Sequence, residues 1–326
     1  MRHTLVAHAP TRLDFGGGWT DVPPFPEERG GFVCNLAIER RATVRLEQVL
    51  DDHASADAGN DSALVRAACN TARVSGVRVQ LSSDFPIGAG LGGSSAAGVA
   101  LGAALAHWKG EKLQQSALAE WSRNIEVQGL QLAGGRQDHY AAAYGGALAL
   151  TFTQTVHVEQ IALHSATIAA LELQCLLLYT GESRISGETI TAVLDSYKER
   201  TPRVVNALDR MKAIAADMAG SLRTGNIDAL GSQIREHWEH QRALHPRITT
   251  GRIDAITSAA YAAGALGMKA LGASGGGCVV IVAPADKTED VSDAVAGLGE
   301  LLHWRVAASG VVVREELPLP NERAPG

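Results

Sequence analysis

Apolar and polar residues alternate along several short stretches of the chain, which is typical of half-buried β-strands. The clearest case is residues 77–81, where Val77, Val79 and Leu81 alternate with polar side chains. Further strands are predicted at residues 31–36, 42–46 and 173–179, and a strand, a glycine turn and a second strand at residues 268–284.

Other stretches show the helical spacing of apolar residues. An alanine-rich helix is predicted from about Ser94 to Trp108, and the segment GGRQDHYAAAYGG predicts a short helix or turn. The remaining helices are predicted at residues 112–132 and within residues 188–217, 226–244 and 252–266. Strand patterns and helix patterns therefore both occur along the chain.

The length of 326 residues suggests two domains, since a domain averages roughly 150 residues. We place the boundary near residue 165, before the apolar run, which gives predicted domains at residues 1–165 and 166–326. Residues 51–62 are rich in Asp, Asn, Ser and Gly and have no apolar period, so they predict a surface loop. The C-terminal tail with Pro318 and Pro320 is expected to fray.

Composition narrows the class of protein. The chain is 46% hydrophobic and 20% charged, with 29 Lys and Arg against 35 Asp and Glu, and no basic cluster, so nucleic-acid binding is disfavoured. The four cysteines lie far apart and suggest neither a disulfide framework nor a zinc site. Apolar stretches are too short for a membrane span. We therefore expect a soluble cytoplasmic protein, and the sequence is compatible with a homodimer.

The segment PIGAGLGGSSAA at residues 86–97 lies between a predicted strand and a predicted helix. Its glycines let the backbone approach an anion, and the helix directs N–H groups and a positive dipole end toward it. Gly88, Gly90 and Gly93 also fit the GxGxxG pattern of dinucleotide sites. The late position, the paired serines and the lack of an acidic residue after a following strand argue against that site, and no GK[ST] supports a Walker loop.

Three other clusters carry candidate chemistry. Arg12 and Asp21 flank a triple-glycine turn, an arrangement suited to a polyol or to an ordinary loop. Glu126 and Asp138 could converge on Mg²⁺ and a hydroxyl, since Mg²⁺ prefers oxygen ligands, or could be two solvated acids. Lys269 precedes glycine-rich residues 272–277, which could form a hairpin only or pack against substrate.

Several aromatic and imidazole side chains are ambiguous. His237 and His240 are spaced i, i+3 and suggest a metal site less than a solvated helix face. The ring of His139 is expected to point away from Asp138 and pack, although assistance to catalysis is the alternative. Trp19 could stack on a sugar or fill space.

The glycine-rich segments, in this order and spacing, resemble the GHMP kinases, which include galactokinase, homoserine kinase and mevalonate kinase. The similarity spans roughly residues 5–285. Within this superfamily, YTGESRIS and GALGMK are similar to D-glycero-D-manno-heptose 7-phosphate 1-kinases, whereas GGWTDVPP also resembles L-fucose kinases. The resemblance implies an α+β fold with a ribosomal-protein-S5-like N-terminal domain, a ferredoxin-like C-terminal domain, and an active site between them.

The resemblance also implies roles for individual residues. Ser95 and Glu126 correspond to magnesium ligands, Asp138 to the catalytic carboxylate, and Arg12 to a catalytic arginine near the transferred phosphate. The nucleotide, ATP, is expected to contact Pro86, Gly88, Gly90, Leu91, Gly92, Gly93, Ser94 and Ser95. The sugar or sugar phosphate is expected to contact Arg12, Gly18, Thr20, Asp21, Arg184, Gly275 and Gly276, with Arg184 on a second phosphate.

The predicted function is therefore an ATP- and Mg²⁺-dependent kinase acting at the anomeric hydroxyl of a sugar. The substrate expected is D-glycero-D-manno-heptose 7-phosphate, giving the 1,7-bisphosphate used in nucleotide-activated heptose and surface polysaccharide synthesis. The alternatives are a 1-kinase for L-fucose or another free sugar, and a non-catalytic nucleotide and sugar sensor. A nicotinamide-dependent oxidoreductase does not fit the context of the glycine motif.

Overall fold

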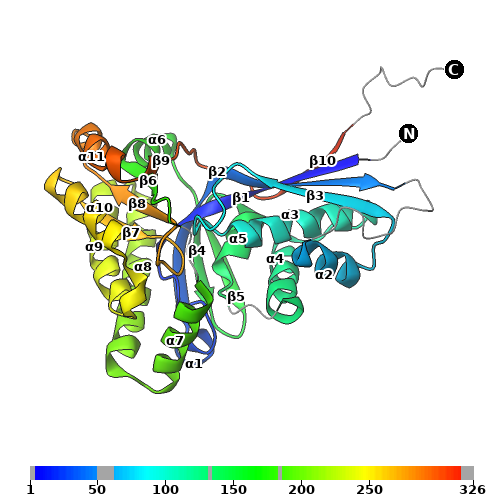
Figure 1. Cartoon of the computed structure of the whole chain (residues 1–326), viewed down its shortest axis with the longest axis horizontal. Coiled ribbons are helices and arrows are strands. Elements are labelled where there is room, and N and C mark those ends of the chain that lie inside the picture. The colour runs from blue at the N-terminus through cyan, green and yellow to red at the C-terminus, as the bar shows by residue number, and fades with distance from the viewer. Residues whose placement is uncertain (1–3, 50–61, 131–133, 183–185, 317–326) are drawn as a thin grey trace.

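The computed structural model describes residues 4–49, 62–130, 134–182 and 186–316. It contains a six-stranded and a four-stranded antiparallel sheet, which lie side by side with helices around them (Figure 1). The first sheet consists of β1 (Thr4–Gly16), β2 (Gly31–Gln48), β3 (Val77–Ser83), β4 (Ala147–Phe152), β5 (Val156–Ile161) and β10 (Val312–Glu316). The predicted α+β class is confirmed.

The long strand β2 organises the first sheet. It joins the two strands predicted at residues 31–36 and 42–46, because the residues between them stay extended and pair with β1 across a register shift. Its first part pairs with β4 and its last part with β3. Before the register shift, Val33 faces one hydrophobic core while Leu36 and Ile38 face another. After the shift, the even-numbered Val44 enters the core of Val33, because the irregularity reverses the alternation.

Helices cover one face of the first sheet. They are α2 (Ala63–Ala72), α3 (Gly93–Trp108), α4 (Gln115–Asn124) and α5 (Gln137–Tyr144). The helix α3, rich in alanine and glycine, packs closely on β1 and β2, which confirms the helix predicted there. The helix predicted at residues 112–132 is shorter, since α4 passes into a π-helical turn at Ile125–Gly129. The helix α1 (Phe25–Arg29) lies before β2.

The second sheet has the strand order β7-β8-β6-β9 and the sequence β-α-β-β-α-β, which is the ferredoxin-like arrangement. Its strands are β6 (Cys175–Tyr179), β7 (Gly267–Ala270), β8 (Cys278–Val282) and β9 (Glu300–Leu301). The accompanying helices are α6 (Ser165–Gln174), α7 (Ser186–Lys198), α8 (Pro202–Thr224), α9 (Ile227–Arg242), α10 (Gly251–Ala262) and α11 (Thr288–Val295), with 3₁₀ turns at Pro246–Ile248 and Ala296–Leu298.

The two halves share a hydrophobic core. Side chains from β1, β2 and β4 pack there against α8, α9, β6 and β8. The strand β10 comes late in the chain but pairs with β1 in the first sheet. The division into domains at residues 1–165 and 166–326 remains a prediction, and it would assign β10 to the second domain. The four cysteines are buried and unpaired. None of the helices among the described residues is both long and apolar enough to span a membrane.

Candidate active site

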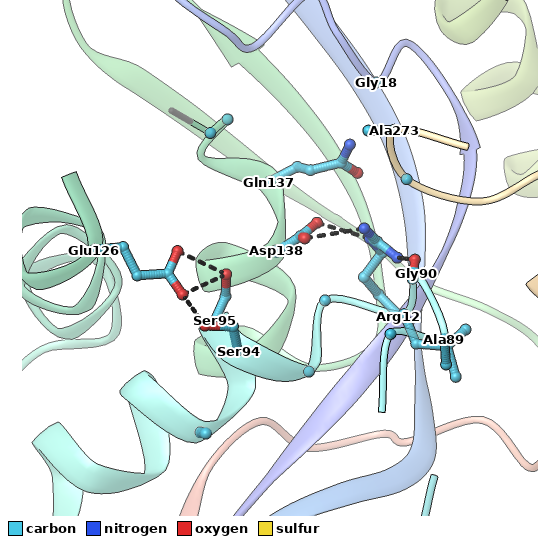
Figure 2. A pocket seen from close by; sticks show the side chains of 18 of the residues that line it. Arg12, Gly18, Ala89, Gly90, Ser94, Ser95, Glu126, Gln137, Asp138 and Ala273 are labelled. Atoms are coloured by element: carbon cyan, nitrogen blue, oxygen red, sulfur yellow. Dashed lines mark hydrogen bonds and ion pairs between the residues drawn. The ribbon is translucent and has the colours of Figure 1, made fainter. Parts of the chain in front are cut away.

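A cavity of about 850 Å³ opens between the glycine loop before α3, the start of α5, and the turn after β7. Its wall combines loop backbone with a few charged side chains, of which Arg12, Glu126 and Asp138 are shown in Figure 2. Residues from the second half also contribute, including Ile190 on α7 and Ala273 after β7. Both halves of the chain therefore build one cavity, and it lies where the resemblance implies an active site.

The glycine loop and the first turn of α3 form one wall of the cavity. Gly88, Gly90 and Gly92 have φ values of 75–77°, a left-handed conformation that favours glycine. The helix begins without a side-chain cap and without an acidic residue in its first turn. Because the first N–H groups of a helix have no partner within it, this end suits a phosphate.

Arg12 and Asp138 form a two-pronged ion pair at the centre of the cavity (Figure 2). The distances are 2.7 Å from Nε to Oδ1 and 2.9 Å from Nη2 to Oδ2, and Arg12 Nη1 donates to the carbonyl of Gly90 at 2.7 Å. Arg12 is 2% exposed, whereas Asp138 is 26% exposed. The arginine is thus fixed between the glycine loop and α5, and the carboxylate stays accessible from the cavity.

Glu126 lies on the π-helical turn and faces the start of α3. Its Oε1 accepts a hydrogen bond from Ser94 Oγ at 2.6 Å, and Ser95 Oγ lies 3.3 Å from Oε2. His139 Nε2 lies 3.2 Å from Oε2 and Nδ1 lies 3.0 Å from Ser122 Oγ, so the ring is buried and packed, as expected. Burial opposes ionisation of Glu126, but hydrogen bonds from His139 and the two serines prevail and lower its pKa.

The oxygen atoms of Ser94, Ser95 and Glu126 are chemically suited to bind a magnesium ion. Mg²⁺ prefers hard oxygen ligands and usually takes only a few from the protein. Ser95 and Glu126 offer a hydroxyl and an ionised carboxylate, and Ser94 offers a second hydroxyl that the sequence did not assign to metal. Within the described residues no group of three or more His, Cys, Asp or Glu is arranged for a metal, so a magnesium site here would need the serines.

Asp21 fixes the start of α5. One carboxylate oxygen, Oδ2, accepts hydrogen bonds from the backbone N–H groups of Arg136 at 2.7 Å and Gln137 at 3.0 Å. Burial raises the pKa of Asp21 to about 6, against the effect of these two hydrogen bonds. Asp21 also lines the cavity, so its predicted contact with substrate remains a prediction, while its contact with α5 positions Asp138.

A buried polar cluster lies behind the cavity wall and joins the two halves. Lys269 of β7 contacts Asp14 of β1, with Nζ 3.0 Å from Oδ2 and 2.6 Å from the backbone oxygen. His237 is buried and accepts a hydrogen bond from the N–H of Gly17, so the prediction of a solvated helix face was wrong. Burial lowers the pKa of His237 to about 3, which keeps the imidazole neutral for this role.

The structure brings most of the predicted site together. The cavity is lined by the predicted residues Arg12, Gly18, Asp21, Pro86, Gly88, Gly90, Leu91, Gly92, Gly93, Ser94, Ser95, Glu126 and Asp138. Thr20, Gly275 and Gly276 do not line it. Thr20 is buried and bonded to the backbone of Gly17, and Gly276 packs against the backbone of Glu182. Arg184 lies outside the described residues.

Sequence reasoning missed other residues of the wall. Gln137 projects into the cavity beside Asp138, and Ala273 rather than the following glycines faces it (Figure 2). Its position next to Asp138 in the sequence is the signal that could have identified Gln137. Trp19 lines the cavity and also packs in a hydrophobic core with Phe25 and Leu178, so both suggested roles stay open.

Curated proteins that are similar in sequence to this chain include kinases. The chain is 26% identical to a bifunctional fucokinase/GDP-fucose pyrophosphorylase of Arabidopsis thaliana, over 89% of this chain and 31% of that protein. It is 25% identical to D-glycero-alpha-D-manno-heptose 7-phosphate kinase of Campylobacter jejuni, over 84% of this chain and 88% of the relative. The chain thus spans about a third of the first relative's length.

A solved structure titled D-glycero-D-manno-heptose 1-phosphate kinase from Bacteroides thetaiotaomicron shares the fold. Its TM-score is 0.76, with 23% identity over 96% of this chain and 99% of that chain. Residues 62–146 match the GHMP kinases N terminal domain and residues 218–301 match the GHMP kinases C terminal domain. These matches include the glycine loop, Glu126 and Asp138, and together they cover just over half of the chain. The chain therefore belongs to the GHMP kinase family.

Proposed function

We propose that this protein transfers the γ-phosphoryl group of ATP to the anomeric hydroxyl of a sugar. One observation carries the proposal: the accessible carboxylate of Asp138 lies at the free N-terminus of α3. A Cβ placed on Gly92, the residue before this helix, would come within 3.0 Å of that carboxylate. The group that would bind phosphate and the group that would receive an acceptor proton are therefore neighbours in one cavity.

The chain's residues divide the work in a way that suits phosphoryl transfer. This reaction passes through a loose transition state, so catalysis depends on positioning and on charge stabilisation. The N–H groups at the start of α3 would hold phosphate oxygens, and Arg12 would approach the transferred group while holding Asp138 in one orientation. Asp138 would orient the acceptor hydroxyl and accept its proton. An anomeric hydroxyl is more acidic than an ordinary alcohol, which suits a weak carboxylate base.

Ser95 and Glu126 would hold the magnesium ion that accompanies ATP, with Ser94 as a third oxygen donor. When bound, the ion supplies positive charge to the phosphate oxygens. The contact between His139 and Glu126 keeps this carboxylate ionised and facing α3.

The sugar that we propose is D-glycero-D-manno-heptose 7-phosphate, phosphorylated at O1. This proposal rests on the Campylobacter jejuni relative, whose length this chain nearly matches. A free sugar such as L-fucose is the second candidate, because the described cavity wall has three carboxylates, those of Asp21, Glu126 and Asp138, and a single cation, Arg12, which is already paired. A second phosphate would then depend on Arg184.

A substrate panel tests the proposal. We expect ATP-dependent ADP release with one or more sugars from a set of free and phosphorylated hexoses and heptoses, and a product phosphate at C1 by NMR. Asp138→Asn should lower kcat by about 10²–10⁴, the share of a positioned base, while binding of a fluorescent ATP analogue changes little. The Asn side chain keeps an oxygen for Arg12, so folding should be retained.

The controls distinguish the candidates. Equal KM values for a free sugar and its phosphate in the wild type exclude a dedicated second phosphate site, whereas a preference that disappears in Arg184→Ala supports one. More than half of the wild-type turnover in Asp138→Asn would remove this carboxylate from the mechanism.

A further inference from the structure

Gln137 lies immediately before Asp138 on α5, and its side chain reaches the same cavity. The residue is only 6% exposed, so its side chain has little freedom to move. In Figure 2 the carboxamide extends past Asp138 toward Gly18 and Ala273. These two small residues come from the two halves of the chain and leave space beside the amide. Gln137 therefore contributes polar atoms to the part of the wall next to the reacting carboxylate.

The described residues provide a hydrogen-bond partner for only one of the two polar atoms of the Gln137 amide. Its Oε1 accepts a long hydrogen bond, 3.5 Å, from Nδ2 of Asn35, a fully buried residue of β2. Its Nε2 has no hydrogen-bond acceptor among the described residues, although the carboxylate of Asp14 lies near the same side of Gly18. That carboxylate is bound to Lys269 instead. Because nearly all buried amides are hydrogen-bonded, the two N–H groups of Gln137 are available for a molecule in the cavity.

The fit around the amide is narrow. A Cβ built on Gly18 would lie 3.0 Å from Gln137 Nε2 and 2.5 Å from Asp14 Oδ2. Any larger residue at position 18 would press against the amide and against Asp14, so glycine here leaves room for Nε2 in the cavity wall. The backbone N–H of Gln137 is also bound to Asp21, which fixes the side chain at its base.

We propose that Gln137 is a specificity residue for the acceptor, whose Nε2 donates a hydrogen bond to a hydroxyl oxygen other than the one phosphorylated. The inference rests on the proposed sugar kinase function and adds to it a requirement of the substrate. The acceptor must carry a second hydroxyl close to the reacting one, since Gln137 and Asp138 are consecutive residues. A deoxy sugar that lacks this hydroxyl leaves the amide unpaired and is rejected.

The test compares protein and substrate changes in a double-mutant cycle. Wild type and Gln137→Leu are assayed with the best sugar of the panel and with its deoxy analogues, one carbon at a time. We expect kcat/KM of the wild type to fall about tenfold or more for one deoxy analogue, and this difference to shrink to threefold or less in Gln137→Leu. The KM for ATP should not change. Gln174→Leu, a buried glutamine outside the cavity, is the matched control and should keep the wild-type discrimination.

Equal discrimination in wild type and Gln137→Leu at every carbon overturns the inference. If Gln137→Leu does not fold, as judged by circular dichroism, Gln137→Met provides the same comparison, because the methionine side chain has a similar length but no N–H group to donate. Failure of the proposed function gives a different result, namely no phosphorylation of any sugar by the wild type. Calorimetric titration of the sugar and the deoxy sugar into wild type and variant then still reports on Gln137. An equal ratio of the two Kd values in both proteins would contradict its role.

Discussion

At the scale of single residues, the site depends on carboxylates that share one cavity but have different surroundings. Asp138 is held by the guanidinium of Arg12 and stays accessible, whereas Asp21 is buried and held by backbone N–H groups. Glu126 is held by hydroxyls and an imidazole. Surroundings of this kind, rather than residue type, separate a carboxylate that stays accessible from one that fixes the start of a helix.

The buried Asp21 gives a prediction for the pH dependence of stability. Burial raises the pKa of Asp21 to about 6, above its ordinary value, so between about pH 4 and pH 6 the folded protein binds a proton that the unfolded chain does not. Asp21 therefore favours folding at low pH, and this contribution is lost as pH rises through about 6. Asp21→Asn should keep both hydrogen bonds to α5 and raise the free energy of unfolding at pH 7 by on the order of 2 kcal/mol.

Urea unfolding of both proteins at pH 4, 5, 6 and 7 measures the effect. The difference in free energy of unfolding between variant and wild type should grow with pH and level off above pH 7. A difference that is constant across this range would mean that Asp21 does not titrate there.

At the scale of elements, the glycine loop and α3 were predictable because their conformation depends on residues that are close together in the sequence. Left-handed glycines followed by a helix start can be inferred within a dozen residues of sequence. The contacts of His139 and His237 were not predictable in this way. The partner of His237 is Gly17, 220 residues away, and only the packing of α9 against β1 brings the two together. The helical spacing of His237 and His240 could not show which face α9 buries.

The start of α3 supports a paired prediction on two glycines with similar φ values. Gly92 has φ +77° and a Cβ there would lie 3.0 Å from the side chain of Asp138, whereas Gly110 has φ +72° and open space around the same position. Alanine should strain both backbones, by about 1 kcal/mol each, and lower Tm to a similar extent. Only Gly92→Ala should also displace Asp138, and we expect its kcat to fall at least tenfold.

Steady-state kinetics and thermal unfolding of both variants provide the comparison. A matched fall in kcat for Gly110→Ala would show that strain at any helix end, and not the contact with Asp138, reduces activity.

At the scale of the whole molecule, the Asp14–Lys269 ion pair connects the first sheet to the second. Both side chains are wholly buried, and Lys269 also donates to the backbone of Asp14. The charges of Lys269 and Arg12 outweigh burial and lower the pKa of Asp14. Removing one partner of such a pair leaves an uncompensated buried charge, which costs about 3–5 kcal/mol.

Lys269→Met should therefore lower the free energy of unfolding by about 3–5 kcal/mol, and the double variant Lys269→Met, Asp14→Asn should recover part of the loss. Guanidinium unfolding followed by fluorescence and circular dichroism measures both. A double variant as unstable as the sum of the two single variants would show that the residues do not act as a pair.

The pairing of β10 with β1 affects how the protein is made. Residues 4–8 receive their partners on one side only from residues 312–316. During synthesis on the ribosome, the main-chain groups along that margin of the first strand have no partner until residues 312–316 have emerged. A nascent chain that has not yet reached these residues thus exposes a strand margin open to pairing with another molecule, and this hazard ends only once β10 is available.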